Sequence, residues 1–291
     1  MDIFISSSLY PNKSVDFAIN DAKSNFCKNI ELSAPHIYQT NDALSKMLIK
    51  YKKNNLNFIL HNYFPRPKED FVLNIASKNS NTYKNCIQLV KNAINLSSKI
   101  ESEIYGIHAG YLADSFADKN GNFVFNKSLN NYSDSLEKSS IFLNNILNFD
   151  KNKKVKILIE NLFPFNKINN SLFCTSDQIN DLMEIIPKDI GILLDLGHLQ
   201  ISSKFYGLKK EKELEKILKK YSNKIYEVHL SENNKVNDLH NSLDKNSWQI
   251  NAIKIINECK TDEKIERKFC LEVRNEKSTK IKKFLDLLLS L

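Results

Sequence analysis

The feature that most constrains the fold is a repeated unit, a short apolar strand followed by an amphipathic helical stretch. Eight such units follow one another in 291 residues, with no linker or low-complexity spacer between them. Apolar strands of this kind are typical of parallel sheets buried on both faces. The predicted strands are 3–6, 30–33, 56–61, 104–108, 155–160, 191–195, 225–230 and 269–273.

Eight strand–helix units predict an α/β fold, a single (β/α)8 TIM barrel that covers residues 1–291. Such a barrel needs about 250 residues, whereas the alternative, a doubly wound open sheet, usually stops at five or six strands. The C-terminal ends of all barrel strands meet at one mouth, where TIM-barrel enzymes carry their chemistry. We therefore expect the polar residues at these strand ends to lie together.

Six of the predicted strands end in a residue that can bind a metal ion. The clearest example is 191–194, which is apolar and is followed by Asp195. A charge at the end of an apolar strand is costly unless it is paired or bound to a metal. The six strand-end residues are His61, His108, Glu160, Asp195, His229 and Glu272.

The segments that follow two of these strands add three more residues of the same kind. His198 comes three residues after Asp195, on an expected loop that Gly197 allows to turn, and Asp238 and His240 follow strand 225–230. Carboxylates and imidazoles suit a zinc-like ion, and cations would relieve the repulsion between clustered carboxylates. By itself, Asp195 could instead cap the next helix beside a hydrogen-bonded His198.

Composition argues against several classes of protein. The formal net charge is +8, but nearly all of the positive charge is lysine spread along the chain, so no basic nucleic-acid patch is indicated. The five cysteines are scattered without C-x-x-C spacing, which is typical of free thiols in a reducing cytosol and gives no cysteine metal site. We find no signal peptide, membrane span or sign of an obligate protein partner, and expect a cytoplasmic protein.

Read in order, the strand ends resemble the xylose-isomerase-like barrel superfamily and, within it, the endonuclease IV family of apurinic/apyrimidinic endonucleases. The resemblance runs from about strand 56–61 to strand 269–273 and includes D-x-x-H at 195–198 and D-x-H at 238–240. It implies about three zinc ions on nine ligands. The implied sets are His61, His108 and Glu160; Glu160, Asp195, His229 and Glu272; and His198, Asp238 and His240.

The resemblance implies two activities. The first, which uses all nine ligands, is zinc-dependent hydrolysis of phosphodiester bonds at abasic sites in DNA. The second is isomerisation or epimerisation of a small sugar or sugar phosphate. This activity needs one divalent ion, Mn2+ or another, on the set of Glu160, Asp195, His229 and Glu272. Glu160 and Glu272 would be the catalytic residues that move a proton, and His198 would hydrogen-bond a sugar hydroxyl. A third interpretation, a non-enzymatic basic binding module, leaves the charged cluster unexplained.

Two predicted loops border the mouth. The loop 62–70 after His61 is stiffened by two prolines, and we expect Tyr63 and Phe64 over the mouth, where with Arg274 they are the candidate substrate-binding residues. The alternative is ordinary packing of both rings against a neighbouring loop. Residues 114–127 form the other expected loop, with a turn at Asn120-Gly121.

Overall fold

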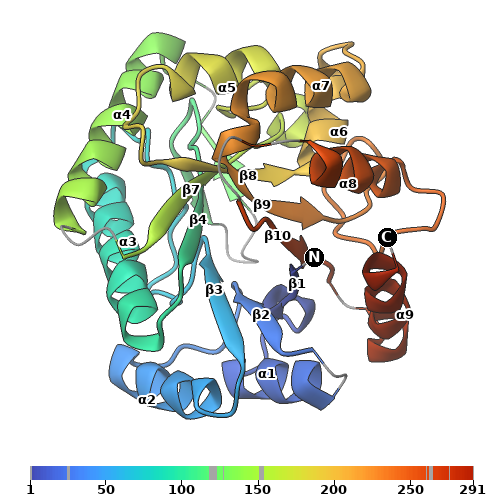
Figure 1. The fold of residues 1–291 in the computed structure, drawn as a ribbon. Coiled ribbons are helices and arrows are strands. Elements are labelled where there is room, and N and C mark those ends of the chain that lie inside the picture. Colours follow the sequence, from blue (N-terminus) through green and yellow to red (C-terminus); the bar gives the residue numbers. More distant parts are fainter. Residues whose placement is uncertain are drawn as a thin grey trace.

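The computed structural model describes residues 2–24, 27–117, 123–126, 128–150, 154–259, 261, 265–274 and 276–290. In this part of the chain, eight parallel strands close into a barrel in sequence order, with helices around the outside (Figure 1). The predicted (β/α)8 barrel is therefore confirmed. The barrel strands are β1 (Asp2–Ser6), β2 (Asn29–Leu32), β3 (Asn57–His61), β4 (Ile104–His108), β7 (Lys156–Glu160), β8 (Gly191–Asp195), β9 (Ile225–Leu230) and β10 (Lys268–Leu271).

The helices bury an apolar face against the barrel. In α3, for example, Leu89, Val90 and Ala93 are buried at helical spacing, and the Asn79 side chain caps the first turn. No helix among the described residues is long and apolar enough to cross a membrane. The helices are α1 (Val15–Ser24), α2 (Asn41–Lys52), α3 (Ser80–Ile100), α4 (Tyr132–Phe149), α5 (Ser176–Met183), α6 (Leu196–Phe205), α7 (Lys210–Tyr221), α8 (Trp248–Glu258) and α9 (Ser278–Leu289).

Successive side chains along each strand point alternately outward, toward the helices, and inward, into the barrel. This alternation gives the protein an outer core and an inner core. In β7, Ile157 and Ile159 pack under the helices, whereas Leu158 faces the barrel interior. The interior residues lie nearer the N-terminal ends of their strands than the polar strand-end residues do. They therefore form a packed floor below the mouth. This floor consists of Phe4, Ile59, Ile104, Leu158, Leu193 and Cys270.

Two segments that we expected to be loops are regular structure. Helix α6 begins directly after Asp195, whose Oδ1 accepts a hydrogen bond from the His198 backbone N–H at 2.7 Å. His198 therefore lies in the first turn of a helix and not on a loop. Gly197 is needed for close packing, because a Cβ atom there would lie 3.0 Å from the Ser231 carbonyl oxygen.

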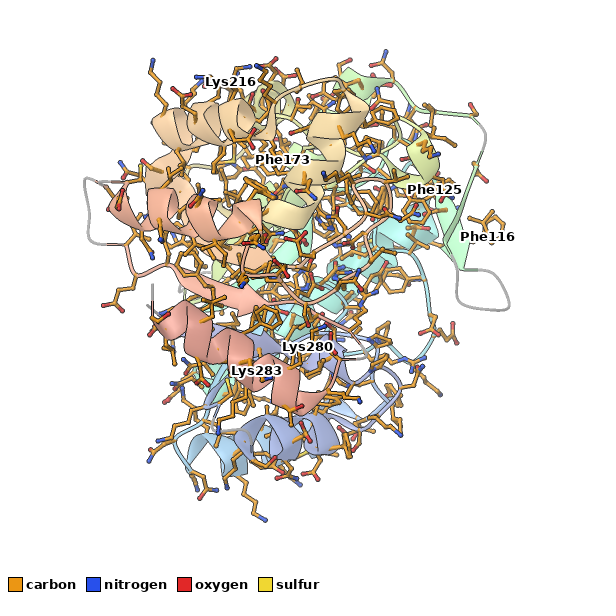
Figure 2. The ribbon with its side chains drawn as sticks, turned by 90° about the vertical axis from the view of Figure 1, so that its right-hand side faces the viewer. Phe116, Phe125, Phe173, Lys216, Lys280 and Lys283 are labelled. Carbon is orange, nitrogen blue, oxygen red and sulfur yellow. The ribbon has the colours of Figure 1, made fainter. Side chains whose placement is uncertain are left out.

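The second segment, 114–127, contains an antiparallel pair, β5 (Ser115–Ala117) and β6 (Phe123–Phe125). Its expected turn at 120–121 lies outside the described residues. Phe116 is exposed on β5, and Figure 2 shows it at the outer edge of the molecule. On β6, Phe125 packs against Tyr111 with ring centroids 5.0 Å apart, which ties the hairpin to the segment after β4.

Candidate metal centre

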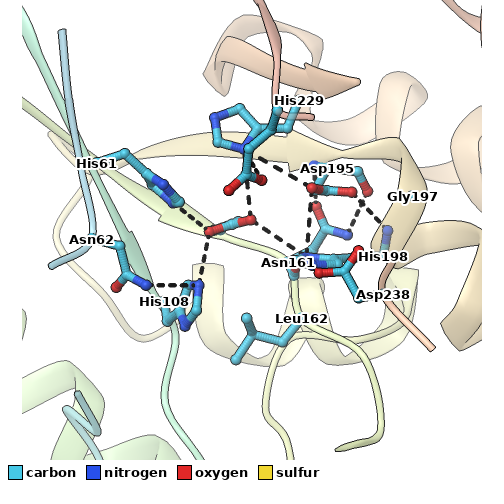
Figure 3. A network of polar contacts seen from close by, with 12 residues as sticks. His61, Asn62, His108, Asn161, Leu162, Asp195, Gly197, His198, His229 and Asp238 are labelled. Carbon is cyan, nitrogen blue, oxygen red and sulfur yellow. Dashed lines mark hydrogen bonds and ion pairs between the residues drawn. The ribbon is translucent and has the colours of Figure 1, made fainter. Parts of the chain in front are cut away.

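All nine predicted ligand residues meet at the C-terminal mouth of the barrel. Figure 3 shows His61 and His108 on one side of the network and Asp195, His198 and Asp238 on the other. Seven of the nine are buried, and His108 and Asp238 are partly exposed. The convergence that was expected from a barrel is confirmed, because strand ends far apart in sequence are brought together by closure of the sheet.

The inner group consists of Glu160, Asp195, His229 and Glu272, whose ligand-type atoms all lie within 4.8 Å of one another. His229 Nδ1 is 3.1 Å from Glu272 Oε2 and 3.9 Å from both Glu160 Oε1 and Asp195 Oδ2. Glu160 Oε1 and Asp195 Oδ2 are buried without a hydrogen-bond partner among the described residues. Three buried carboxylates beside one imidazole are a site that a divalent cation fits.

Glu160 connects the inner group to two more histidines. Its Oε2 lies 2.8 Å from His61 Nε2 and 3.3 Å from His108 Nε2. The two imidazole rings come from neighbouring strands, β3 and β4, with centroids 6.0 Å apart. These three side chains are the first of the sets implied by the resemblance, and they are adjacent in space.

The outer triad consists of His198, Asp238 and His240 and lies beside the inner group. Asp238 Oδ2 is 2.7 Å from His240 Nε2 and 3.4 Å from His198 Nε2. Asp238 Oδ1 is buried without a hydrogen-bond partner among the described residues. His198 Nδ1 is only 3.4 Å from Glu160 Oε1, so the triad and the inner group form one continuous centre.

Each of the five histidines of this centre directs one ring nitrogen toward a carboxylate of the centre and the other toward an orienting group. Histidines that bind metals in proteins are usually held in this way. The outward contacts are His61 to Ser33 Oγ (3.3 Å), His108 to Tyr111 Oη (3.2 Å), His198 to the Asn161 carbonyl oxygen (2.8 Å), His229 to Glu31 Oε2 (2.6 Å) and His240 to the Glu272 carbonyl oxygen (3.1 Å).

Sequence reasoning missed several residues that support the centre, among them Asn161, Glu31 and Glu227. The Asn161 side chain accepts a hydrogen bond from the Asp195 N–H at 2.7 Å and donates one to the Asp195 carbonyl oxygen at 3.0 Å. Glu31 and Glu227 are fully buried in the barrel interior below the mouth. The alternation of strand residues could have revealed Glu227, because it lies two positions before His229 and so faces the same side of the sheet.

The two histidines that share Glu160 have opposite pKa shifts. Burial lowers the pKa of His108, and Glu160 only partly offsets this effect. Burial also favours a lower pKa for His61, but the negative charges of Glu31 and Glu160 outweigh this effect and raise the pKa of His61 to about 9. Burial also raises the pKa of Asp195, to about 6. Without a cation the centre therefore retains protons at neutral pH, and a bound cation would displace them.

A cavity of about 680 Å3 opens above the centre. This volume is typical of small-molecule sites. No lysine is found among the described residues that line the cavity, and of its two arginines Arg66 is paired with Asp70 at 3.0 Å. Arg274 lines the cavity, as expected of a candidate substrate-binding residue. Aromatic side chains form much of the wall, namely Tyr63, Phe71, Tyr111, Phe163 and Phe165.

Loop 62–70 borders this cavity, but only one of the two aromatic side chains expected there, Tyr63, lines it. Tyr63 lines the cavity and packs against Phe71 with ring centroids 6.2 Å apart. The expectation that Phe64 lies over the mouth is wrong. Its ring is 1% exposed in the outer core and packs against His36, because burial behind the loop removes more apolar surface from water than a place over a polar mouth would.

Comparison with known proteins agrees with this architecture. An uncharacterized protein of Methanocaldococcus jannaschii is 25% identical over 189 residues, which cover 65% of this chain and 57% of that protein. The crystal structure of a D-tagatose 3-epimerase-like protein superposes with a TM-score of 0.75 at 20% identity, covering 100% of this chain and 97% of that chain. The IOLI protein, solved with a bound zinc atom, gives 0.70 at 12% identity, with coverage of 100% and 98%.

At these identities the structural likeness establishes the fold. The family assignment comes from the sequence itself, because residues 22–286 match the model of the xylose isomerase-like TIM barrel family. The protein belongs to the xylose isomerase-like TIM barrel family.

Proposed function

We propose that the protein is a divalent-metal-dependent isomerase or epimerase that acts on a small sugar or sugar derivative. The observation that carries this proposal is the inner group, of which Glu160 and Glu272 line a cavity of small-molecule size. Glu160 and Glu272 come from strand ends that are not neighbours in the barrel, β7 and β10, yet their carboxylates approach within 4.8 Å. Two carboxylates placed in this way can exchange a proton with one carbon atom.

The inner group would hold the ion through Glu160, Asp195, His229 and Glu272. Oxygen-rich sets with one imidazole suit Mn2+, Zn2+ and similar ions. When bound, the ion would polarise a carbonyl of the substrate and so acidify the adjacent C–H. The unpartnered oxygens of Glu160 and Asp195 support this assignment, because buried carboxylate oxygens without a partner are rare in proteins.

The two glutamates would carry the proton. Although burial opposes ionisation, nearby histidines hold the pKa of both carboxyls below the usual value, so both are ready to accept a proton near neutral pH. One would remove the proton from the carbon next to the carbonyl. The other, after taking up a proton from solvent, would deliver that proton to the opposite face of the same carbon. His198 would bond a substrate hydroxyl through Nε2, which lies 3.4 Å from Asp238 Oδ2, because its Nδ1 is held 2.8 Å from the Asn161 carbonyl oxygen.

The cavity favours a sugar over a DNA duplex. DNA-binding surfaces make many contacts from lysine and arginine to phosphates. Here the described lining offers Arg66, already paired with Asp70, and Arg274. The aromatic walls also suit the apolar faces of a sugar ring and exclude water. The structural likeness to the D-tagatose 3-epimerase-like protein also favours a sugar as the substrate.

Phosphodiester hydrolysis at a centre of about three zinc ions is the second candidate, and one specific observation favours it. All nine residues of the implied ligand sets are present and adjacent, whereas an isomerase has no need for His61, His108, Asp238 or His240 as ligands. Cleavage at abasic sites would then use the outer triad as a third ion site.

The proposal is tested by assaying the purified protein, loaded with Mn2+ or Zn2+, on ketoses, aldoses and their phosphates. Glu160→Gln and Glu272→Gln should each reduce sugar conversion by about 10²–10⁴-fold, the usual contribution of a positioned acid or base. Glu276→Gln is the matched control and should keep full activity, because Glu276 bonds Ser242 and Lys280 outside the cavity. Cleavage of an abasic-site oligonucleotide without conversion of any sugar would favour the second candidate.

A further inference from the structure

Below the metal centre lies a buried acidic layer made of Glu31 from β2 and Glu227 from β9. Both side chains are fully buried in the barrel interior. With His229 and Cys270 they form a group whose ligand-type atoms lie within 4.8 Å of one another. Two carboxylates inside a barrel are costly to bury, so their retention requires a physical reason.

The contacts of Glu31 give that reason. Its Oε2 lies 2.6 Å from His229 Nε2, the shortest outward contact made by any of the five histidines of the centre. The same oxygen is 3.9 Å from His61 Nδ1. Glu227 Oε1 lies 3.4 Å from His229 Nε2 and has no hydrogen-bond partner among the described residues. Glu31 is therefore the main contact of His229 on the side away from the cavity.

His229 also differs from the other four histidines in the orientation of its ring. His61, His108, His198 and His240 direct Nε2 to a carboxylate of the centre, and the nearest hydrogen-bond partner of each Nδ1 is a neutral oxygen. His229 directs Nδ1 to Glu272 and Nε2 to a carboxylate. A charged acceptor binds an imidazole N–H more strongly than a neutral acceptor does. It also makes the lone pair of the opposite ring nitrogen a stronger metal ligand.

We propose that Glu31 is a positioning residue of the metal centre. It accepts the Nε2–H of His229, which fixes the tautomer and leaves the Nδ1 lone pair directed at the inner group. Its negative charge also strengthens Nδ1 as a ligand. Glu227 adds a weaker contact to the same N–H. The inference rests on the proposed function in one respect, that the inner group binds a divalent ion.

The first test compares metal affinities. Glu31→Gln keeps the size of the side chain and an acceptor oxygen but removes the charge, and it should weaken Zn2+ binding about 10–100-fold in competition with a chromophoric chelator. The absorption spectrum of the Co2+-loaded protein should change as well. Glu227→Gln should lose less affinity. Glu213→Gln is the matched control, a buried carboxylate of α7 that accepts from the Ser176 N–H, and it should bind Zn2+ like the wild type.

The second test uses the wild type alone, so that it remains decisive if Glu31→Gln does not fold. Long-range 1H–15N NMR of the Zn2+-loaded protein should show one metal-bound histidine ring protonated at Nε2, in contrast to any other bound rings, which should be protonated at Nδ1. Equal Zn2+ affinity and an identical Co2+ spectrum in Glu31→Gln would overturn the inference, as would the absence of a metal-bound ring protonated at Nε2. A wild type that binds no divalent ion would overturn the proposed function itself.

Discussion

The inner group and the outer triad occupy the same mouth but are built in different ways. Glu160, Asp195 and His229 end or nearly end hydrogen-bonded barrel strands and are fully buried, so their positions are set by closure of the sheet. Asp238 and His240 lie on the segment between β9 and α8, and the Asp238 side chain is 12% exposed. The inner group is therefore the part of the centre that the barrel itself specifies, whereas the triad depends on a loop.

The loop that carries Asp238 and His240 is nevertheless held in place. Glu232 and Asn241 exchange two backbone hydrogen bonds, of 2.8 and 2.9 Å, which close the base of the loop. His240 has a positive φ of 49°, a conformation that is uncommon outside glycine and is often found at functional sites. The difference between the two regions teaches that the inner group can serve either proposed reaction, while the triad decides between them.

The largest expected effect comes from breaking the inner group at Asp195. Asp195→Asn keeps an oxygen for the cap of α6, since asparagine caps helices as well as aspartate does, but removes the anionic ligand. We expect the inner ion to be lost and sugar conversion to fall by more than about 100-fold. Replacing a residue that only orients a ligand lowers metal affinity by about 10–100-fold, and replacing a ligand itself should lower it further. Elemental analysis and circular dichroism should show lost metal with retained helix content. Full activity in this variant would remove the inner group from the mechanism.

Changing the pH should move metal affinity and ion-free stability in opposite directions. Glu31 and Glu160 raise the pKa of His61 to about 9 although burial opposes this shift, and the unfolded value is about 6.5. The protonated imidazole therefore stabilises the ion-free protein fully below pH 6.5, and this stabilisation is lost as the pH rises to 9. Over the same window Zn2+ affinity should rise, by up to about tenfold per pH unit for each proton displaced. Thermal melts with and without Zn2+ measure both trends, and parallel trends would contradict the assignment of His61 to the centre.

A smaller effect should follow from breaking the outer triad. Asp238→Ala leaves His198 and His240 without their shared carboxylate, but the inner group keeps its four residues. Under the proposed function, sugar conversion should fall less than about tenfold, because the proton-moving glutamates are untouched. A phosphodiesterase would instead lose most of its activity with its third ion. Kinetics on both substrate classes separate the two outcomes, and an inactive sugar reaction in this variant would place the triad within the catalytic machinery.

The sequence predicted the barrel and the nine residues at its mouth because both depend on simple rules of strand topology. Apolar runs marked the strands, and the parallel closure of the sheet brought their polar ends together. The helical position of His198 was missed because Asp195 serves as both strand end and helix cap, which leaves no intervening turn residues. Glu31 was missed because a single carboxylate within a short strand gives no local sign of which face it occupies.

The position of Phe64 was also not predictable from the sequence of its loop. Two adjacent aromatic residues in a loop 62–70 gave no basis for deciding which ring would face the cavity and which would face the core. The structure buries Phe64 and leaves Tyr63 on the cavity wall, its hydroxyl bonded to the Leu73 backbone N–H. A tyrosine can use such a place because its hydroxyl finds a hydrogen-bond partner, which a phenylalanine cannot do.

The measurement that tests the central claim most directly is solvent-deuterium exchange catalysed by the wild type. The protein, loaded with Mn2+ or Zn2+, is incubated in D2O with a panel of ketoses, aldoses and sugar phosphates, and carbon-bound deuterium is followed by NMR. The proposed function predicts that at least one sugar gains deuterium at the carbon next to its carbonyl, and that Glu160→Gln and Glu272→Gln abolish this gain. Metal-loaded protein that exchanges no sugar, yet cleaves an abasic-site oligonucleotide, would contradict it.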